Sequence, residues 1–334
     1  MTRDLVPLTD PPGEQLALPQ PVVERVREMI LDGVSPATRR AYRADWEIFV
    51  NWCERMGRVP LPCTADTLAA FLVEQADSGL HTSTLEGRLA AIRKAHELKG
   101  FPSPTTDPMV KAAIRGIRRT YGSAPNDVAL PLRLVQLQAI VGRLTARTDI
   151  QQARTRALLL IGWAGAFRRS ELVAIDVEHV QWHRGGIRIQ IPFSKTDQEG
   201  RGQSVAIPAG KNAATCPCRA LGHWFTLSGV SSGAVFRSFR RLPGLPPRLM
   251  LTGRLPADEV NNTVKAAVRA IGAERPDDYS AHSLRAGFVT EAAERGVPLH
   301  VIRQQTRHEK IDTLIRYIRA VRALEDSAAG KVGL

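Results

Sequence analysis

Apolar residues in the first third of the chain recur with the period of an α-helix, after an opening stretch that does not. The first 21 residues are rich in proline and are expected to form a flexible arm. Ser35 and Pro36 then supply an N-cap followed by proline in the first turn, which predicts a helix start. Three further helices are predicted at about 64–78, 82–99 and 107–121, each followed by glycine. Together they predict a small domain of four helices.

The pattern changes after residues 122–131, which are rich in glycine, proline and polar side chains and therefore predict a linker. Residues 134–144 return to helical spacing, and residues 153–167 are apolar nearly all round, which predicts a buried helix. Residues 187–193 and 205–207 alternate apolar and polar side chains around a turn, and they form the only clear strand pair. Helical spacing returns from Pro256, so a mostly helical second domain with a small antiparallel sheet is predicted.

Composition and charge narrow the choice of partner. The chain has 334 residues, which suits two domains, and 43% hydrophobic and 24% charged residues are ordinary for a globular protein. Lys and Arg number 46 against 33 Asp and Glu, a formal net charge of +13. This excess favours nucleic acid as the partner over the other interpretation, a basic enzyme with a solvated surface.

The polar start of the chain and the lack of any apolar stretch of about 18 residues predict no signal peptide and no membrane span. The four cysteines are few for this length, which favours a reducing compartment and a cytoplasmic protein. Cys216, Cys218 and His223 are three possible metal ligands at poor spacing, whereas a structural zinc site normally has four. We therefore expect no metal.

Two of the predicted helices carry clustered basic residues that predict a DNA-binding surface. These are Arg88, Arg93 and Lys94 on the third helix, and Lys111, Arg115, Arg118 and Arg119 on the fourth. The four on the last helix stand at i, i+4, i+7 and i+8, so they share a face, and no acidic residue lies between 109 and 120. Such a face suits contact with phosphates, although a solvated positive surface is the alternative.

Several segments of the second domain carry reactive or cationic side chains, and each alone is a weak signal. In order they are Arg168 and Glu171 after the buried helix, Lys195 in the hairpin turn, His282 and Arg285 at a helix start, and His308 nine residues before Tyr317. This order and spacing resemble the tyrosine recombinases of the phage integrase family. The segment from 282 to 319 is the most specific part, and the similarity spans roughly residues 30–325.

The resemblance implies a mainly α fold, with an N-terminal helical core-binding domain of the SAM-like type and an α+β catalytic domain that holds a small antiparallel sheet. It divides the chain into a flexible arm (1–21), a core-binding domain (22–121), a linker (122–131) and a catalytic domain (132–334). The tail from about residue 320 would mediate oligomerisation. The implied partners are double-stranded DNA with an inverted-repeat core site and further copies of the chain, from a dimer to a tetramer on DNA. No membrane partner and no cofactor are implied.

The resemblance also implies a chemistry. The phenolic oxygen of Tyr317 would attack a DNA phosphodiester and form a 3′-phosphotyrosine, and rejoining through a Holliday junction would need no ATP because the bond energy is kept. Arg168 and Arg285 would bracket the non-bridging oxygens of the transition state with permanently charged donors, a task that other nucleases give to metal ions.

The remaining roles that the resemblance implies concern protons and orientation. Lys195 would protonate the leaving 5′ oxygen, and His282 would assist proton transfer at the tyrosine. His308 would donate a hydrogen bond to a phosphate oxygen. Glu171 would repel a phosphate, so it is expected to orient His282 or an arginine from behind.

Two positions depart from the family pattern. The residue before the second histidine is commonly glycine, whereas this chain has Arg307, whose side chain would either shift the loop or add a phosphate contact. The turn that holds Lys195 is long and includes Asp197 and Glu199.

Two other functions share part of this signature. A DNA-binding regulator with a silent active site would not need the complete catalytic set. A type IB topoisomerase would relax DNA as a monomer and would have little use for the apolar tail positions, which are Val321, Leu324, Ala328 and Val332. Both features favour a recombinase.

Overall fold

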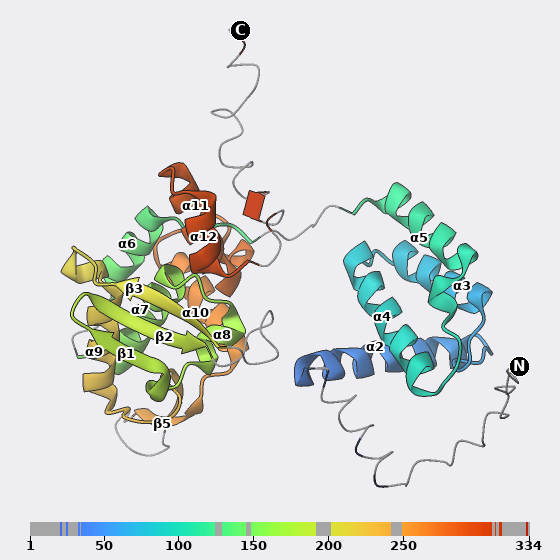
Figure 1. Cartoon of the computed structure of the whole chain (residues 1–334), viewed down its shortest axis with the longest axis horizontal. Helices are drawn as coiled ribbons and strands as arrows, with labels where there is room; N and C mark the ends of the chain where they lie inside the picture. Colours follow the sequence, from blue (N-terminus) through green and yellow to red (C-terminus); the bar gives the residue numbers. More distant parts are fainter. Residues whose placement is uncertain are drawn as a thin grey trace, which may run out of the picture. The chain divides into compact units, whose positions relative to one another are not determined.

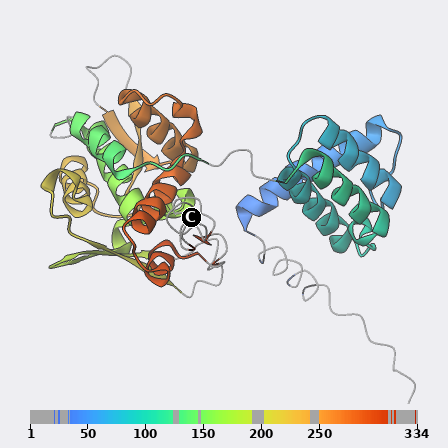
Figure 2. The same cartoon turned by 90° about the horizontal axis from the view of Figure 1, so that it is seen from above.

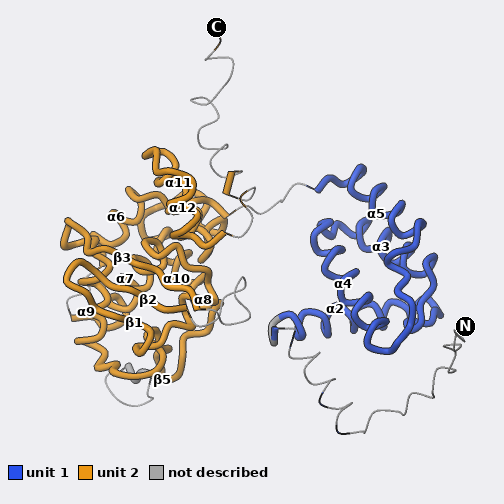
Figure 3. The backbone as a smooth tube through the Cα atoms, viewed as in Figure 1, with its two compact units in different colours: residues 1–126 blue, residues 127–334 orange. Residues whose placement is uncertain are grey.

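The structure is a computed structural model of the whole chain. It describes residues 35–123, 129–144, 148–191, 202–241 and 249–308, together with the single positions 21, 25, 33, 311, 314, 315 and 332. The chain divides into two compact units, Met1–Asn126 and Asp127–Leu334 (Figure 3). Lys195, Tyr317, Phe193 and all of the tail except Val332 lie outside the described residues. Among the described residues, no helix is both long and apolar enough to cross a bilayer.

Unit 1 is helical where it is described, and its helices begin within one residue of the starts that the sequence predicts. They are α2 (Pro36–Arg55), α3 (Ala65–Asp77), α4 (Thr82–Leu98) and α5 (Pro108–Tyr121), with a 3-10 turn at Pro104–Thr106. The Ser35 hydroxyl accepts the Thr38 N–H at 3.2 Å, and the Asp107 carboxylate accepts the Met109 N–H at 2.8 Å. These bonds satisfy donors that a helix start leaves without partners.

Aromatic side chains form the centre of the unit 1 core. Phe49 and Phe71 are fully buried, and their ring centroids lie 5.0 Å apart in an edge-to-face arrangement. Trp52 packs on Phe71 at 5.4 Å and donates its indole N–H to Glu74 at 2.8 Å, so its polar atom is satisfied. Packing of this kind fixes α2 and α3 against each other and leaves α5 to present its polar face to solvent.

Unit 2 is mostly helical with two small antiparallel sheets (Figures 1 and 2), which confirms the predicted fold class. Its helices are α6 (Leu134–Arg143), α7 (Ile150–Ala164), α8 (Arg169–Ala174), α9 (Pro217–Ser228), α10 (Ala257–Ala270), α11 (Ala281–Glu294) and α12 (Leu299–Thr306). Short 3-10 turns lie at Val177–His179, Ala213–Thr215 and Pro276–Asp278. The predicted helix at 153–167 is α7, which ends three residues earlier than expected because Gly165 begins a tight turn.

The larger sheet has the strand order β1 (Val180–His183), β2 (Gly186–Ile191) and β3 (Gln203–Pro208). Ile187 pairs with Ile207 and Ile189 with Val205, and all four side chains are buried, so the predicted alternation is confirmed. The sequence missed β1, and it missed a second pair, β4 (Arg237–Arg241) with β5 (Leu249–Arg254). In Figure 2 the yellow-green larger sheet runs along one edge of unit 2.

The core of unit 2 surrounds α7, whose residues 157–161 are almost wholly buried. Its closest packing is at Gly287 of α11, where an added Cβ would lie 1.9 Å from the carbonyl oxygen of Leu132. That same carbonyl accepts the Trp163 indole N–H at 3.0 Å. Glycine at this position therefore lets α11 approach the chain segment that enters the domain, and α11 carries two of the predicted site residues.

Candidate active site

The turn between α7 and α8 is the centre of the site. Gly165 has no room for a side chain, because a Cβ there would lie 2.1 Å from the Phe167 ring. Ala166 adopts a left-handed backbone conformation, with φ of 46°. The Ala166 carbonyl accepts Arg285 Nη1 at 2.8 Å, and the Gly165 carbonyl accepts Arg307 Nη1 at 3.2 Å. The strained turn thus presents carbonyl oxygens that hold two guanidiniums.

Arg168 and Glu171 form the start of α8. The Glu171 carboxylate accepts the Arg168 backbone N–H at 3.0 Å and Arg168 Nη1 at 2.6 Å. The Glu171 side chain is almost inaccessible, whereas that of Arg168 keeps 21% of its surface exposed. Burial alone would raise the pKa of Glu171, but the charges of Arg307 and Arg168 and the bonds from Arg168 lower it. Glu171 therefore contacts an arginine, one of the partners expected for it.

Arg285 and His282 lie on the first turns of α11, which Ser280 caps by accepting the His282 N–H at 3.2 Å. Arg285 is 2% exposed, so its guanidinium is fixed inside the domain. His282 is exposed to solvent, yet the protein atoms around its ring lower its pKa, and the charges of Arg285 and Arg168 lower it further. Its imidazole is therefore neutral near pH 7 and able to accept a proton.

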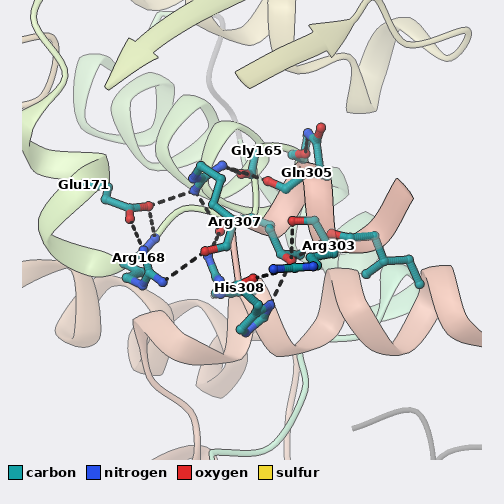
Figure 4. A network of polar contacts seen from close by, with 12 residues as sticks. Gly165, Arg168, Glu171, Arg303, Gln305, Arg307 and His308 are labelled. Carbon is teal, nitrogen blue, oxygen red and sulfur yellow. Dashed lines mark hydrogen bonds and ion pairs between the residues drawn. The ribbon is translucent and has the colours of Figure 1, made fainter. Parts of the chain in front are cut away.

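Arg307 ends α12 in the left-handed conformation, with φ of 57°. Glycine adopts this conformation without strain, which is a physical reason for the glycine of the family pattern noted from the sequence. The Arg307 side chain is 4% exposed and turns inward, where Nη2 donates to Glu171 Oε2 at 2.8 Å (Figure 4). Of the two alternatives considered for this side chain, a shifted loop or an added phosphate contact, the structure does not support the phosphate contact, because Glu171 already binds the guanidinium.

His308 follows Arg307 and is half-buried. Its Nδ1 lies 2.8 Å from the Thr306 hydroxyl, which itself lies 2.7 Å from the carbonyl oxygen of Ile302. The single hydroxyl proton is needed for Ile302, so we assign the His308 proton to Nδ1, which leaves Nε2 as an acceptor in the neutral ring. Burial first, and then the nearby charges of Arg285 and Arg168, lower the pKa of His308 to about 3.

The structure brings together most of the predicted catalytic residues whose positions it describes. The charges of Arg168, Arg285 and Arg307 all act on His308, as does His282, although these residues come from different elements of unit 2. Such a concentration of positive charge and hydrogen-bond donors suits an anion with several oxygens, such as a phosphodiester.

Other polar groups considered from the sequence have structural contacts. Cys216 Sγ accepts the Gly210 N–H at 3.2 Å, and Cys218 Sγ donates to the Ile207 carbonyl at 3.6 Å. In the part of the chain that the structure describes, no group of three His, Cys, Asp or Glu side chains could hold a metal ion. Tyr279 is 7% exposed, and its hydroxyl accepts Gln136 Nε2 at 2.9 Å.

The predicted DNA-binding residues fall into three groups. Lys111, Arg115 and Arg119 are exposed along α5. Arg118 is exposed too, but its Nη2 lies 2.5 Å from Glu86 on α4. The third group is Arg88, Arg93 and Lys94 on α4, of which Arg93 donates to Thr105 at 3.3 Å and Lys94 lies 3.5 Å from Glu97.

Arg88 is the member that the structure does not support as a DNA contact. It is 8% exposed, its guanidinium lies 5.9 Å from the centre of the Phe71 ring, and it pairs with Asp45 at 3.9 Å. It also donates to Gln75. The Arg88 guanidinium is thus already engaged by Asp45 and Gln75 within unit 1, a contact set that indicates a structural role for it.

Sequence reasoning missed two functional features of the site. One is the Thr306 hydroxyl, which determines which ring nitrogen of His308 carries the proton. Its only sequence signal was its position two residues before His308. The only sequence signal for the inward turn of Arg307 was a large residue where the family pattern has glycine.

Comparisons with known proteins identify the family of the chain. The model described as "Phage integrase family" matches residues 132–323, and "Phage integrase, N-terminal SAM-like domain" matches residues 28–99. An integrase/recombinase xerD homolog of Selenomonas ruminantium is 33% identical over 298 residues, covering 88% of this chain and 85% of that protein. Tyrosine recombinase XerC of Corynebacterium efficiens is 25% identical over 299 residues, covering 89% of this chain and 86% of that protein.

Solved structures show the same fold. The XerH site-specific recombinase bound to palindromic difH substrate, in a post-cleavage complex, aligns with a TM-score of 0.56 at 18% identity. The alignment covers 80% of this chain and 72% of XerH. The family match spans more than half of the chain, and the Selenomonas relative is aligned over most of both lengths. The chain therefore belongs to the phage integrase family and is a site-specific recombinase of the tyrosine type.

Proposed function

We propose that the chain cuts DNA through a covalent 3′-phosphotyrosine at Tyr317 and rejoins it through a Holliday junction, without metal or ATP. The observation that supports this most is that Arg168, the pair His282 and Arg285, and His308 come from three separate segments of the sequence but influence one another electrostatically. Two guanidiniums, one fully buried and one partly exposed, suit the charge that develops on the non-bridging oxygens during attack.

The proton transfers follow from the same groups. His282 is neutral near pH 7, so it can accept the proton that the Tyr317 phenol must lose. Lys195 supplies a proton to the leaving 5′ oxygen. His308 can donate to a phosphate oxygen from Nε2 only when its ring carries a second proton, and a bound phosphate anion favours that charged form. Tyr317 and Lys195 enter this scheme from the sequence alone.

Replacement of Tyr317 by Phe tests the nucleophile. The probe is a nicked duplex that the wild-type chain selects from a random library by covalent capture. We expect Tyr317→Phe to form no adduct and to bind the duplex within a few-fold of wild type, because only the hydroxyl is removed. Tyr279→Phe is the matched control and should form the adduct, since its hydroxyl is engaged by Gln136. An adduct with Tyr317→Phe would show that another residue attacks.

We further propose that the DNA is double-stranded with an inverted-repeat core site, and that Lys111, Arg115 and Arg119 contact its phosphates, with smaller contributions from Arg93, Lys94 and Arg118. The palindromic substrate named for the XerH complex supports the symmetric site. The exposure of the three α5 residues supports the contact surface. The four cysteines are buried free thiols, which supports action in a reducing cytoplasm.

Assembly on DNA is proposed to use an apolar groove in unit 2. The groove has a volume of about 490 Å³, and its lining includes Leu134, Trp163, Phe288 and Val301. Its lining also includes the charged residues Glu291 and Arg295. We propose that the tail of a neighbouring copy, from about residue 320, fills it with an apolar helix face and joins dimers into tetramers.

Truncation after residue 319 tests this assembly, because every proposed catalytic residue is retained. We expect single-site binding to be preserved, while cooperative binding to a two-arm site and strand exchange are abolished. Gel-shift titrations on one-arm and two-arm duplexes measure this, beside a thermal melt. If the tail only caps its own unit, truncation will lower the melting temperature of the free protein and leave cooperativity intact.

A further inference from the structure

The Arg307 side chain makes contacts beyond the helix that it ends. Nη1 donates to the carbonyls of Gln305 at 2.7 Å and Gly165 at 3.2 Å, and Nη2 donates to Glu171 at 2.8 Å and approaches the Ala166 carbonyl at 3.4 Å. The guanidinium also lies 5.2 Å from the centre of the Phe167 ring. A single buried group thus links the end of α12 to the turn before α8 (Figure 4).

The contact with Glu171 alters the charge available to Arg168. Glu171 is shared by two guanidiniums, with Oε1 bound to Arg168 and Oε2 bound to Arg307. Two positive groups and one negative group leave the cluster with a net charge of +1. If Glu171 had Arg168 as its sole counter-charge, that pair would be neutral, and much of the attraction of Arg168 for a phosphate would be cancelled.

The turn that leads into His308 is held by the Arg307 side chain, through its bond to the Gln305 carbonyl, and by two other arginines. Arg168 Nη2 lies 3.4 Å from the Arg307 carbonyl oxygen, and Arg303 Nε donates to the His308 carbonyl at 3.1 Å. These bonds hold the left-handed turn from both sides. Because His308 follows directly, the orientation of its ring depends on how firmly that turn is fixed.

We propose that Arg307 is a positioning residue, which binds the buried Glu171 carboxylate so that Arg168 keeps its positive charge for the scissile phosphate and His308 keeps its orientation. This inference rests on the proposed cleavage chemistry. A glycine at position 307 could not compensate the charge of Glu171, since glycine has no charged side chain.

Replacement of Arg307 by Gly tests the proposal without straining the backbone, since glycine accepts a φ of 57°. We expect the variant to fold and to bind the selected nicked duplex, and its cleavage rate at saturating protein to fall about 10- to 100-fold. Arg307→Lys keeps the charge but not the forked geometry, so it should recover part of the rate.

The double variant Arg307→Gly with Glu171→Gln distinguishes charge balance from simple packing. It removes the positive and the negative group together, so no carboxylate of this cluster remains to offset the charge of Arg168. We expect the double variant to cleave faster than Arg307→Gly alone. If Arg307 only packs the turn, a second substitution in the same cluster will make cleavage slower or leave it unchanged, and that result would overturn the proposal.

A titration of the free protein separates this inference from the cleavage chemistry. Carbon-13 NMR of the Glu171 carboxyl group should show its pKa raised in Arg307→Gly, because the largest attractive charge on it is removed while its burial remains. An unchanged pKa would overturn the inference whatever the cleavage assay gives. Absence of any adduct with the wild-type chain would instead overturn the proposed function, and the titration would still decide the role of Arg307.

Discussion

Positive charge is arranged in two different ways in the two units. In unit 2 the guanidiniums of Arg285 and Arg307 are almost fully buried, and each is held by backbone carbonyl oxygens of one turn. In unit 1 the basic residues of α5 stand in solvent, and of the four predicted there only Arg118 has an ion pair among the described contacts, with Glu86.

The difference bears on what each set can do. Buried guanidiniums have given up their hydration and their freedom to rotate, so their charge is directed at one fixed place and their effects depend on one another. Exposed basic side chains displace counterions from DNA, and their effects add and fall with salt. Mutations in the buried cluster of unit 2 should therefore change the catalytic rate, whereas mutations on the α5 face of unit 1 should change the salt-dependent affinity for DNA.

The largest effect is expected for Arg285→Ala. Removal of one donor to the transition-state charge typically lowers a rate by about 100- to 1000-fold, so covalent adduct formation should fall by that factor. Binding of the nicked duplex should remain within a few-fold, since the other basic residues remain. Single-turnover cleavage and gel-shift titration measure the two quantities on the same duplex.

Arg269→Ala is the matched control for that experiment. Arg269 belongs to unit 2 as well, but it is exposed and pairs with Asp277 at 2.5 Å. Its replacement should change neither rate nor binding, because exposed pairs contribute little. A thermal melt shows whether Arg285→Ala still folds, and Arg285→Lys retains the charge if it does not. Equal cleavage by the Arg285 and Arg269 variants would show that the buried guanidinium of Arg285 contributes no more to the rate than an exposed one.

A smaller effect, on affinity alone, is expected for the exposed face of α5. Replacement of Lys111, Arg115 and Arg119 by Ala should reduce the slope of log K against log salt by about 0.9 for each phosphate that is no longer neutralised, hence by about 2.7. Cleavage at saturating protein should be unchanged. Arg118→Ala should reduce the slope less, because Arg118 is already paired with Glu86.

Binding isotherms between about 50 and 200 mM salt provide that measurement. An unchanged slope in the triple variant would mean that these residues form only a solvated surface. A slope change as large for Arg118 as for its neighbours would mean that DNA displaces Glu86.

The helices of unit 1 could be predicted closely from the sequence because their signals are local. Predicted starts and ends for α3, α4 and α5 fall within one residue of those observed, since signals such as the Asp107 cap and the glycines after each helix act on the nearest turn. The α5 face was predicted for the same reason. Its partner Glu86 was not, because it comes from another helix, 32 positions away.

In unit 2, local sequence signals did not predict every strand or every side-chain contact. Strands β4 and β5 were missed because their sequences, RSFRR and LMLTGR, lack regular alternation of apolar and polar residues. The order of reactive residues predicted that Arg168, Arg285 and His308 belong to one site. It could not predict that Arg307 turns inward, because its partner Glu171 is 136 positions away and the choice depends on tertiary packing.

Burial of the site has a further consequence that the exposed α5 face does not share. His308 is held neutral, with its pKa lowered to about 3 by burial and by neighbouring guanidiniums. In the unfolded chain the same group titrates near its usual value of about 6.5. Between these two values the unfolded state binds a proton that the folded state does not, so the free energy of unfolding contributed by this group falls as the pH is lowered through that window.

We therefore expect the free energy of unfolding of the wild-type chain, measured by urea denaturation, to decrease between pH 7 and pH 5. His308 contributes at most about 1.4 kcal/mol per pH unit to this slope, and its partial exposure reduces that figure. His308→Gln should flatten the slope, since Gln does not titrate, and it can still bond the Thr306 hydroxyl. Replacement of exposed Lys111 by Gln should leave the slope as it is in wild type, because a solvated lysine stays charged in this range. An unaltered slope in His308→Gln would mean that the ring of His308 keeps an ordinary pKa despite the surrounding charges, and the acid sensitivity assigned here to the buried cluster would have to arise elsewhere.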